Sequence, residues 1–495
     1  MDPHRAITYA RSHEETFVSE LKEFLRFPSV SSQPKHAQDL KQCAEWLANH
    51  LLRIGMQRVK MIPTRGHPIV YAEWKRSASA PTILIYGHYD VLPGEPLSAW
   101  KTPPFVPTVI GNNLHSRGAS DDKGQLFAHI KAIECYLKTE PALPVNVKCI
   151  FEGEEEIGSP HLTAFIVRNK RALKADAAVI SDTRMLAPGR PAISYAQRGG
   201  LRAELEIKGP PQELHSGNFG GAIYNPLHAI SEMIAQLHDT QGRVAIPGFY
   251  NDVRRWSPQE RAYMARTGPS DKQILEEAKV GSGWGETGFS QYERTTIRPS
   301  LSVNGITGGH QGPGAKSIIP AQAIAKLSFR LVPDQDPRKI AQLFRDHIQN
   351  ITPPQVQSSL RTFAAIEPAL IDRNHPALSA AAVAYKQGFG VLPVFLRSGG
   401  SIPVVNTCQK ILGIPAVLMG FGLPGDHIHA PNEKFHLPNF YKAIATSIWY
   451  LSLAAKLRDS LPTPKKNLGR SSHSHPERAR QIAIRSPRAS RQLGR

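Results

Sequence analysis

Cysteine is scarce in this sequence, and the few cysteines that occur are widely separated. They are Cys43, Cys135, Cys149 and Cys408, and no two of them form a CxxC pair. This spacing excludes a disulfide framework and a cysteine-based zinc site. We therefore expect inert, buried thiols, in agreement with a reducing compartment.

The sequence also lacks a long hydrophobic run. No stretch approaches the ~20 apolar residues that are needed to cross a bilayer. Residues 1–20 are polar and charged, without the hydrophobic centre of a signal peptide. We therefore expect no membrane association and a cytoplasmic location. The 495 residues, 41% of them hydrophobic and 20% charged, are typical of a soluble enzyme with a large buried core.

Acidic residues are few relative to basic ones, 41 against 60, which gives a net charge of +19. Residues 465–495 hold nine Lys or Arg but one acid, Glu477. This segment is too poor in large apolar residues to form a core, so we predict a disordered basic tail over residues 463–495. It also has no interleaved aromatic residues on which bases could stack. We expect no specific nucleic-acid partner.

Four apolar runs are typical of buried strands: Thr82–Tyr86, Val145–Phe151, Ala177–Ile180 and Ala416–Met419. Between the first two, hydrophobic residues recur at helical spacing over residues 126–137. Alternating strands and helices predict an α/β fold, with helices around a mostly parallel sheet. In such folds ligands gather beyond the carboxyl ends of the strands.

Two histidines and three carboxylates follow segments of this kind, and they are His88, Asp121, Glu156, Asp182 and His429. Taken one at a time, they could equally be a hydrogen-bonded histidine, a helix N-cap or a solvated acidic turn. Together they suit a pair of divalent metal ions that share one carboxylate. The nitrogen ligands favour zinc or another borderline first-row ion over calcium or magnesium. A free glutamate beside such a centre, here Glu155, would serve as the general base of a hydrolase.

A gap of 247 positions separates Asp182 from His429, which suggests an inserted domain. The gap contains alternating runs of its own at Leu201–Ile207 and Ala323–Leu331, and a polar, glycine-rich stretch over residues 269–288 that we interpret as a connector. The predicted organisation is a catalytic domain over residues 1–200 and 372–462, interrupted by an α+β lid and dimerisation domain over residues 201–371.

Five motifs together resemble the co-catalytic zinc exopeptidases and amidohydrolases, the family that includes carnosine dipeptidase, aminoacylase and succinyl-diaminopimelate desuccinylase. The motifs are Gly87–Val91, Arg117–Gly124, Glu152–Ser159, Leu214–Gly217 and His429–Glu433. The resemblance covers residues 10–460, and residues 316–320, 329–333 and 399–403 resemble its dipeptidase branch.

The resemblance implies a role for each matching residue. Two divalent metal ions per subunit, zinc or alternatively manganese or cobalt, would be bound by His88 with Asp182 and by Glu156 with His429. Asp121 would bridge the two ions, and a cis peptide would follow it. The other implied roles are orientation of His88 by Asp90, general acid and base catalysis by Glu155, oxyanion stabilisation by His215, often from the partner subunit of a homodimer, and substrate binding by Ser317, Arg330 and Ser401.

Within the dipeptidase branch, one departure bears on the substrate. Ser398 stands where these enzymes often carry a glutamate near the amino end of the substrate, and losing that acid weakens recognition of a free amino group. The sequence therefore predicts metal-dependent hydrolysis of dipeptides or short peptides, with removal of N-acyl groups from amino acids as an alternative. A catalytically silent binding or scaffold protein is the third hypothesis, and the intact ligand set and Glu155 oppose it.

Overall fold

A nine-stranded sheet forms the centre of the structure, a computed structural model that describes residues 1–459. Its strand order is β1-β2-β6-β3-β7-β17-β8-β15, with β16 also paired to β8. The strands are β1 (Arg58–Ile62), β2 (Ile69–Trp74), β3 (Thr82–His88), β6 (Asn146–Glu152), β7 (Ala177–Ile180), β8 (Ala192–Gln197), β15 (Ala369–Leu370), β16 (Val394–Ser398) and β17 (Ala416–Gly420).

Parallel pairing is concentrated at the middle of this sheet. Strands β6, β3, β7 and β17 run parallel to one another, and β16 runs parallel to β8. The outer strands β1 and β2, and the pairs that β8 makes with β17 and β15, are antiparallel. The predicted α/β fold is confirmed. Since the parallel central strands end at one edge, the segments that follow β3, β6, β7 and β17 meet there.

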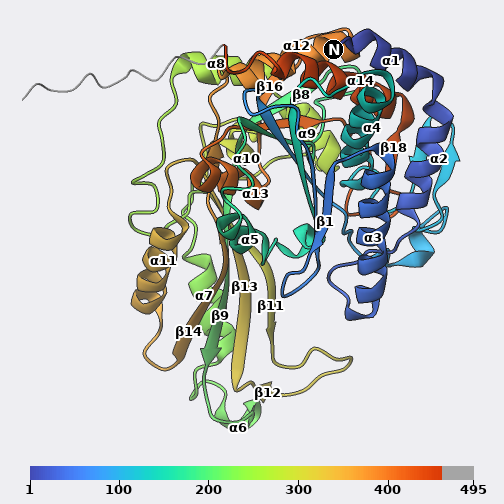
Figure 1. The fold of residues 1–495 in the computed structure, drawn as a ribbon. Coiled ribbons are helices and arrows are strands. Elements are labelled where there is room, and N and C mark those ends of the chain that lie inside the picture. Colours follow the sequence, from blue (N-terminus) through green and yellow to red (C-terminus); the bar gives the residue numbers. More distant parts are fainter. Residues whose placement is uncertain (460–495) are drawn as a thin grey trace, which may run out of the picture. The chain divides into compact units, whose positions relative to one another are not determined.

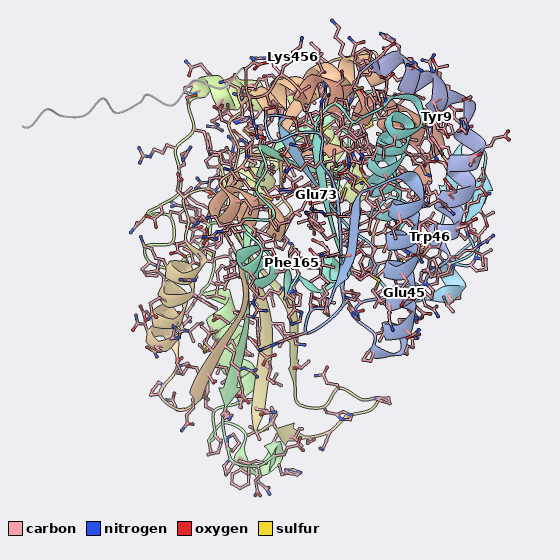
Figure 2. The ribbon with its side chains drawn as sticks, in the orientation of Figure 1. Tyr9, Glu45, Trp46, Glu73, Phe165 and Lys456 are labelled. Atoms are coloured by element: carbon pink, nitrogen blue, oxygen red, sulfur yellow. The ribbon has the colours of Figure 1, made fainter. Side chains whose placement is uncertain are left out.

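Helices pack against this sheet and against one another. Contacts join α3 to β1 and β2, α4 to β3, and α12 to β17. Trp46 of α3, which is labelled in Figure 2, stacks on Phe24 of α2 with ring centroids 5.2 Å apart. The helices around the large sheet are α1 (Pro3–Ser12), α2 (Glu14–Leu25), α3 (Ala37–Ile54), α4 (Lys123–Thr139), α5 (Leu162–Arg168), α12 (Pro376–Phe389), α13 (Pro403–Thr407) and α14 (Leu437–Ala454).

A second, antiparallel sheet with the strand order β11-β13-β9-β14 is drawn in the lower part of Figure 1. Helices α7 and α11 pack against it, and their apolar residues form a hydrophobic core separate from that of the large sheet. Its elements are β9 (Gly199–Lys208), β11 (Ser300–Gly308), β13 (Gln322–Leu331), β14 (Gln357–Ile366), α7 (Pro226–Ala235) and α11 (Pro337–Ile351). The alternating runs at Leu201–Ile207 and Ala323–Leu331 form β9 and β13, as predicted.

The boundaries of the lid at residues 201 and 371 stay a prediction, because contacts group Met1–Ser460 as a single unit. The predicted tail, residues 463–495, lies outside the described residues. None of the described helices combines the length and the apolar character that crossing a membrane requires. All four cysteines are buried and free of disulfides.

The interpretation of residues 269–288 as a connector was wrong in part. This stretch contains helix α9 (Asp271–Ala278), which lies between α8 (Pro258–Thr267) and α10 (Gln291–Thr296). Ser270 and Gln273 form a capping box that satisfies backbone N–H groups at the start of α9. The Ser-x-x-Gln spacing of the box was the sequence signal for a helix here.

Short two- and three-stranded sheets complete the fold. Strand β10 (Leu214–His215) pairs with β12 (Ile318–Ile319), and helix α6 (Ser216–Phe219) follows β10 directly. Figure 1 shows α6 and β12 at the lower tip of the view, at the far end of β9 and β13. The other small sheet has the order β18-β5-β4, with β4 (Thr108–Ile110), β5 (Asn113–His115) and β18 (Lys434–His436).

Candidate active site

His88 lies at the last position of β3 and is completely buried. Its Nδ1 is 3.1 Å from the backbone oxygen of Asp90, and its Nε2 is 3.1 Å from Oδ1 of Asp121. Burial alone would lower the pKa of His88, but its hydrogen bonds with Asp121 and Asp90 raise it well above the usual range. The ring is therefore held by Asp90 on one side and presents its other nitrogen to Asp121.

Asp121 lies between two imidazoles. On the side away from His88, its Oδ2 is 2.9 Å from Nε2 of His429. The same nitrogen is 3.3 Å from Oε2 of Glu156. Asp121 precedes α4 and is joined to Asp122 by a cis peptide, as the family resemblance implies. One carboxylate thus contacts side chains that come from β3 and from the loop after β17.

The five predicted ligands form two groups that share Asp121. The first is His88, Asp121 and Asp182, and the second is Asp121, Glu156 and His429. Within each group, one potential ligand atom from each residue lies within 4.8 Å of the others. His427, two residues before His429, belongs to neither group. The structure therefore brings the residues together in the predicted pairs, while their role as ligands stays a prediction.

Carboxylates crowd this site. Burial and the nearby carboxylates of Asp121 and Glu155 raise the pKa of Asp182 well above its ordinary value. The carboxylate of Asp182 makes no hydrogen bond or ion pair with the rest of the described chain. A partly buried acid without a partner carries a desolvation cost, and divalent cations would remove that cost. The donor set of two imidazoles and three carboxylates fits two such cations.

Glu155 immediately precedes the predicted ligand Glu156 in the chain and is the first residue of a short 3₁₀ turn, Glu155–Ile157. The two oxygens of the Asp90 carboxylate accept hydrogen bonds from the backbone N–H of Glu155 and Glu156, each at 3.1 Å. Burial, together with the charges of Asp121 and Glu156, raises the pKa of Glu155 to about 8. Asp90 therefore fixes this turn as well as His88, a second contact that the sequence did not reveal.

The four remaining predicted site residues lie in two places. Arg330 and Ser401 meet, with Nη1 of Arg330 3.2 Å from Oγ of Ser401. His215 is exposed on β10, where its Nδ1 accepts a hydrogen bond from Gly217 N–H, and the backbone oxygen of Ser317 accepts one from Ser216 N–H. No recorded contact joins His215 to the two ligand groups within the described part of the chain.

Comparison with known proteins shows the family to which this chain belongs. The model of peptidase family M20/M25/M40 matches residues 84–451. The chain belongs to this family. It is 31% identical over 457 residues to the human Beta-Ala-His dipeptidase, covering 88% of this chain and 89% of that protein. The prediction of a peptidase-type hydrolase that resembles the dipeptidase branch is thereby confirmed.

Two solved structures of the M20 family are closely similar. The dipeptidase Dug1p of Saccharomyces cerevisiae has a TM-score of 0.81 at 27% identity, covering 92% of this chain and 99% of its own. The metallo-carboxypeptidase Sso-CP2 of Sulfolobus solfataricus has a TM-score of 0.80 at 34% identity, covering 89% of this chain and 99% of its own.

Glu433 contributes to this M20 site in a way that the sequence did not reveal. Its carboxylate is fully buried and accepts four hydrogen bonds, from the backbone N–H of Gly118, Ser120 and Asp121 and from Nη1 of Arg117. The four distances lie between 2.8 and 3.1 Å. Glu433 was recognised only as part of the motif that identifies His429, because nothing local indicates partners more than 310 positions away.

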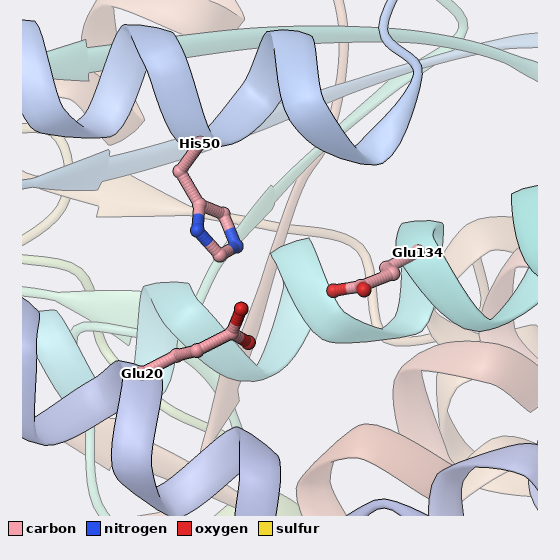
Figure 3. Close-up of side chains that lie close together, drawn as sticks. All are labelled: Glu20, His50 and Glu134. Atoms are coloured by element: carbon pink, nitrogen blue, oxygen red, sulfur yellow. The ribbon is translucent and has the colours of Figure 1, made fainter.

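A further group with metal-ligand chemistry lies outside the M20 site. Figure 3 shows His50 of α3 facing Glu20 of α2 and Glu134 of α4. The ammonium of Lys131 contacts all three side chains, at 2.6 Å from Glu134 and 3.1 Å from His50, and it forms an ion pair with Glu20. Since this buried ammonium already supplies the positive charge, the group has its cation and is a structural ion cluster.

Proposed function

We propose that this protein is a metal-dependent dipeptidase that hydrolyses the peptide bond of dipeptides and short peptides. The observation that carries the proposal is the pair of ligand groups that share Asp121, with Glu155 beside them. Two relatives that match most of the chain support it, because the human one is named a Beta-Ala-His dipeptidase and the one from Candida albicans a Cys-Gly metallodipeptidase.

Two divalent ions would be held by the two groups, with His88 and Asp182 on one, Glu156 and His429 on the other, and Asp121 on both. We propose zinc as the resident metal, with manganese and cobalt as alternatives, because imidazole and carboxylate ligands together suit borderline first-row ions. When bound, such ions lower the pKa of water and polarise a substrate carbonyl.

The residues of the chain then divide the remaining work. Glu155 accepts the proton of the attacking water as it adds to the peptide carbonyl, and it delivers a proton to the nitrogen that leaves as an amine. A carboxyl group beside the ligand groups suits both roles, because the proton that it accepts from the water can be returned to the leaving nitrogen. Asp90 keeps Glu155 in place through the backbone of the turn.

The far end of the substrate would bind at Arg330 and Ser401. A guanidinium can hold a carboxylate through two parallel hydrogen bonds, and the Ser401 hydroxyl lies 3.2 Å from Nη1 of Arg330. An anchor for a terminal carboxylate restricts the enzyme to peptide ends. This is the property that makes it an exopeptidase.

We further propose a homodimer in which the inserted lid, residues 201–371, supplies His215 to the partner's site. His215 is exposed at the tip of the lid, next to Ser317, and contacts no member of the ligand groups of its own described chain. His215 would stabilise the oxyanion of the tetrahedral intermediate, and Ser317 would contact the substrate backbone. Strand β11 is an edge strand that exposes Val303 and Ile306, an apolar surface that a second copy would cover.

Removal of N-acyl groups is the second candidate function, and Ser398 favours it. This residue occupies the position near the amino end of the substrate, and its hydroxyl accepts a hydrogen bond from Gly400 N–H at 3.2 Å. A neutral side chain there gives no ion pair to a free ammonium. For the location we propose the cytoplasm, since the four buried thiols suit a reducing compartment.

The test uses full-length protein stripped of metal and reloaded with zinc, manganese or cobalt. Hydrolysis of dipeptides, longer peptides and N-acyl amino acids is measured for the wild type and for Glu155→Gln. We expect metal-dependent cleavage of dipeptides that falls by 10²–10⁴-fold in the variant, with the metal retained. Turnover without metal, or undiminished turnover in Glu155→Gln, would refute the mechanism. Cleavage of N-acyl amino acids alone would select the second candidate.

A further inference from the structure

Three arginines gather at one end of the lid sheet. Arg198 lies directly before β9, Arg202 is on β9, and Arg330 is on the neighbouring strand β13. In the antiparallel register Arg330 faces Gly200, and Arg202 faces Ser328. Side chains alternate along a strand, so Arg202 and Arg330 point to the same face of the sheet as diagonal neighbours. The Cα atoms of diagonal neighbours are about 7–8 Å apart.

None of these arginines has an acidic partner among residues 1–459. The guanidinium of Arg198 is buried and donates to the backbone oxygens of Gly399, Arg294 and Arg298 and to Oγ of Ser300. Arg330 donates to Ser401, and Arg202 makes no hydrogen bond or ion pair with the part of the chain that the structure describes.

The acids on the same face are already paired. Glu204 lies 3.9 Å from Arg361, and Glu206 lies 3.5 Å from Lys208. Opposite Arg202 stand Ser328 on one side and Phe363 on the other, neither of which carries charge. The aromatic ring of Phe363 is covered by Arg361. Arg202 is therefore an exposed cation with nothing in the described chain to neutralise it.

The arginines also act on one another. Burial and the charge of Arg202 lower the pKa of Arg330, and burial and the charge of Arg330 lower the pKa of Arg198 to about 9. Like charges at this distance repel, and a bound anion relieves the repulsion. One carboxylate at Arg330 and Ser401 would leave Arg202 unpaired. A ligand with two carboxylates would engage both exposed guanidiniums.

We propose that Arg202 is a specificity residue that favours peptides ending in glutamate or aspartate. The inference rests on the proposed function, in which Arg330 and Ser401 hold the terminal carboxylate of the substrate. The side-chain carboxylate of the same terminal residue then lies within reach of Arg202 on the adjacent strand. Substrates with a neutral terminal residue lack this second ion pair.

Matched dipeptides test the proposal on the full-length, metal-loaded enzyme. Ala-Glu is compared with Ala-Gln, and Ala-Asp with Ala-Asn, because each pair differs in charge at nearly constant shape. We expect the wild type to favour the acidic member in kcat/KM by about fivefold, the upper range for an exposed ion pair. Arg202→Gln should bring the ratio close to one, and Arg202→Glu should shift preference toward Ala-Lys over Ala-Gln.

Lys208→Gln is the matched control. Lys208 is on the same strand and face as Arg202, is also exposed and loses the same charge, but it lies six residues farther from the Arg330 end. We expect this variant to keep the wild-type ratio. An acidic preference that is absent in the wild type, or unchanged in Arg202→Gln, would overturn the proposal.

The proposal and the dipeptidase function can fail separately. If no dipeptide is hydrolysed, the proposed function fails, and binding of free glutamate and glutamine to the metal-loaded protein is measured by calorimetry. Tighter binding of glutamate that is lost in Arg202→Gln supports the anion site. Equal binding of the two amino acids refutes it.

Discussion

The carboxylate of Glu433 holds the backbone of Asp121, accepting its N–H at 3.1 Å and that of Ser120 at 3.0 Å. Glu433 therefore fixes the residue that both predicted ligand groups share. It also lies four positions after His429, so one loop supplies a predicted ligand and the support of another. Groups that orient ligands in this way raise metal affinity without touching the metal.

Replacing Glu433 tests this support. Glu433→Gln puts an amide where the buried backbone donors need an acceptor, and we expect metal affinity to fall by about 10–100-fold. Competition with a chromogenic chelator measures the affinity, and thermal unfolding reports on the fold. Glu293→Gln is the control. Glu293 of α10 is also a buried carboxylate, which accepts hydrogen bonds from Arg261 and from the N–H of Ser290, and this variant should bind metal normally. Equal affinity in the two variants would contradict the role of Glu433.

Mixing two inactive variants tests catalysis across the dimer. Glu155→Gln and His215→Ala should each lose most activity as homodimers. After the two are unfolded and refolded together, half of the dimers are mixed and each carries one complete site, so about one quarter of wild-type activity returns. Activity is assayed with a dipeptide, and dimer content by light scattering. If His215 acted within its own subunit, the mixture would stay inactive.

Restoring an acid at Ser398 tests the origin of substrate choice. A carboxylate near the amino end of the substrate would form an ion pair with the free ammonium of a dipeptide. It would give no such gain to a substrate with a neutral N-acyl group. Ser398→Glu should therefore raise kcat/KM for Ala-Ala relative to N-acetyl-alanine by roughly fivefold. Ser398→Gln has similar size without the charge and should leave the ratio near that of the wild type. A gain shared by both variants would show that size, not charge, matters.

We expect the free energy of unfolding to decrease in acid because of the buried His50. Burial, together with the positive charges of Lys131 and Arg53, lowers the pKa of His50 from 6.5 to about 2. Below pH 6.5 the imidazole of His50 binds a proton in the unfolded chain but not in the folded chain. The free energy of unfolding therefore decreases as the pH is lowered. The contribution is about 1.4 kcal/mol per pH unit between these two values. Urea unfolding between pH 7 and pH 5 measures it, and His50→Gln should show a shallower decline than the wild type.

The elements that were predicted correctly have local signals. The buried runs ending at His88 and Ile180 became β3 and β7 because continuous apolar residues suit strands that are covered on both faces. The hydrophobic spacing over residues 126–137 became part of α4. Helix α9 was missed because a polar composition was weighted above its capping box.

The site could be predicted only as far as motifs reach. The candidate ligands stand in short, recognisable segments, so the family resemblance could name the residues that the structure brings together in two groups. The hydrogen bonds of Asp90 to the Glu155 turn, the contacts of Glu433 and the unpaired state of Arg202 depend on segments brought together by folding. No local pattern encodes such contacts, because their partners are specified by topology.

The separation of Asp121 from His429 and Glu433 also has a consequence for synthesis of the protein. The loop that carries Asp121 is synthesised 312 positions before its acceptor at Glu433. Contacts between such distant segments carry an entropic cost of loop closure, which slows their formation. The loop at Asp121 therefore lacks its buried acceptor on any nascent chain that ends before Glu433, and we expect the predicted metal site to stay incomplete until Glu433 has been synthesised.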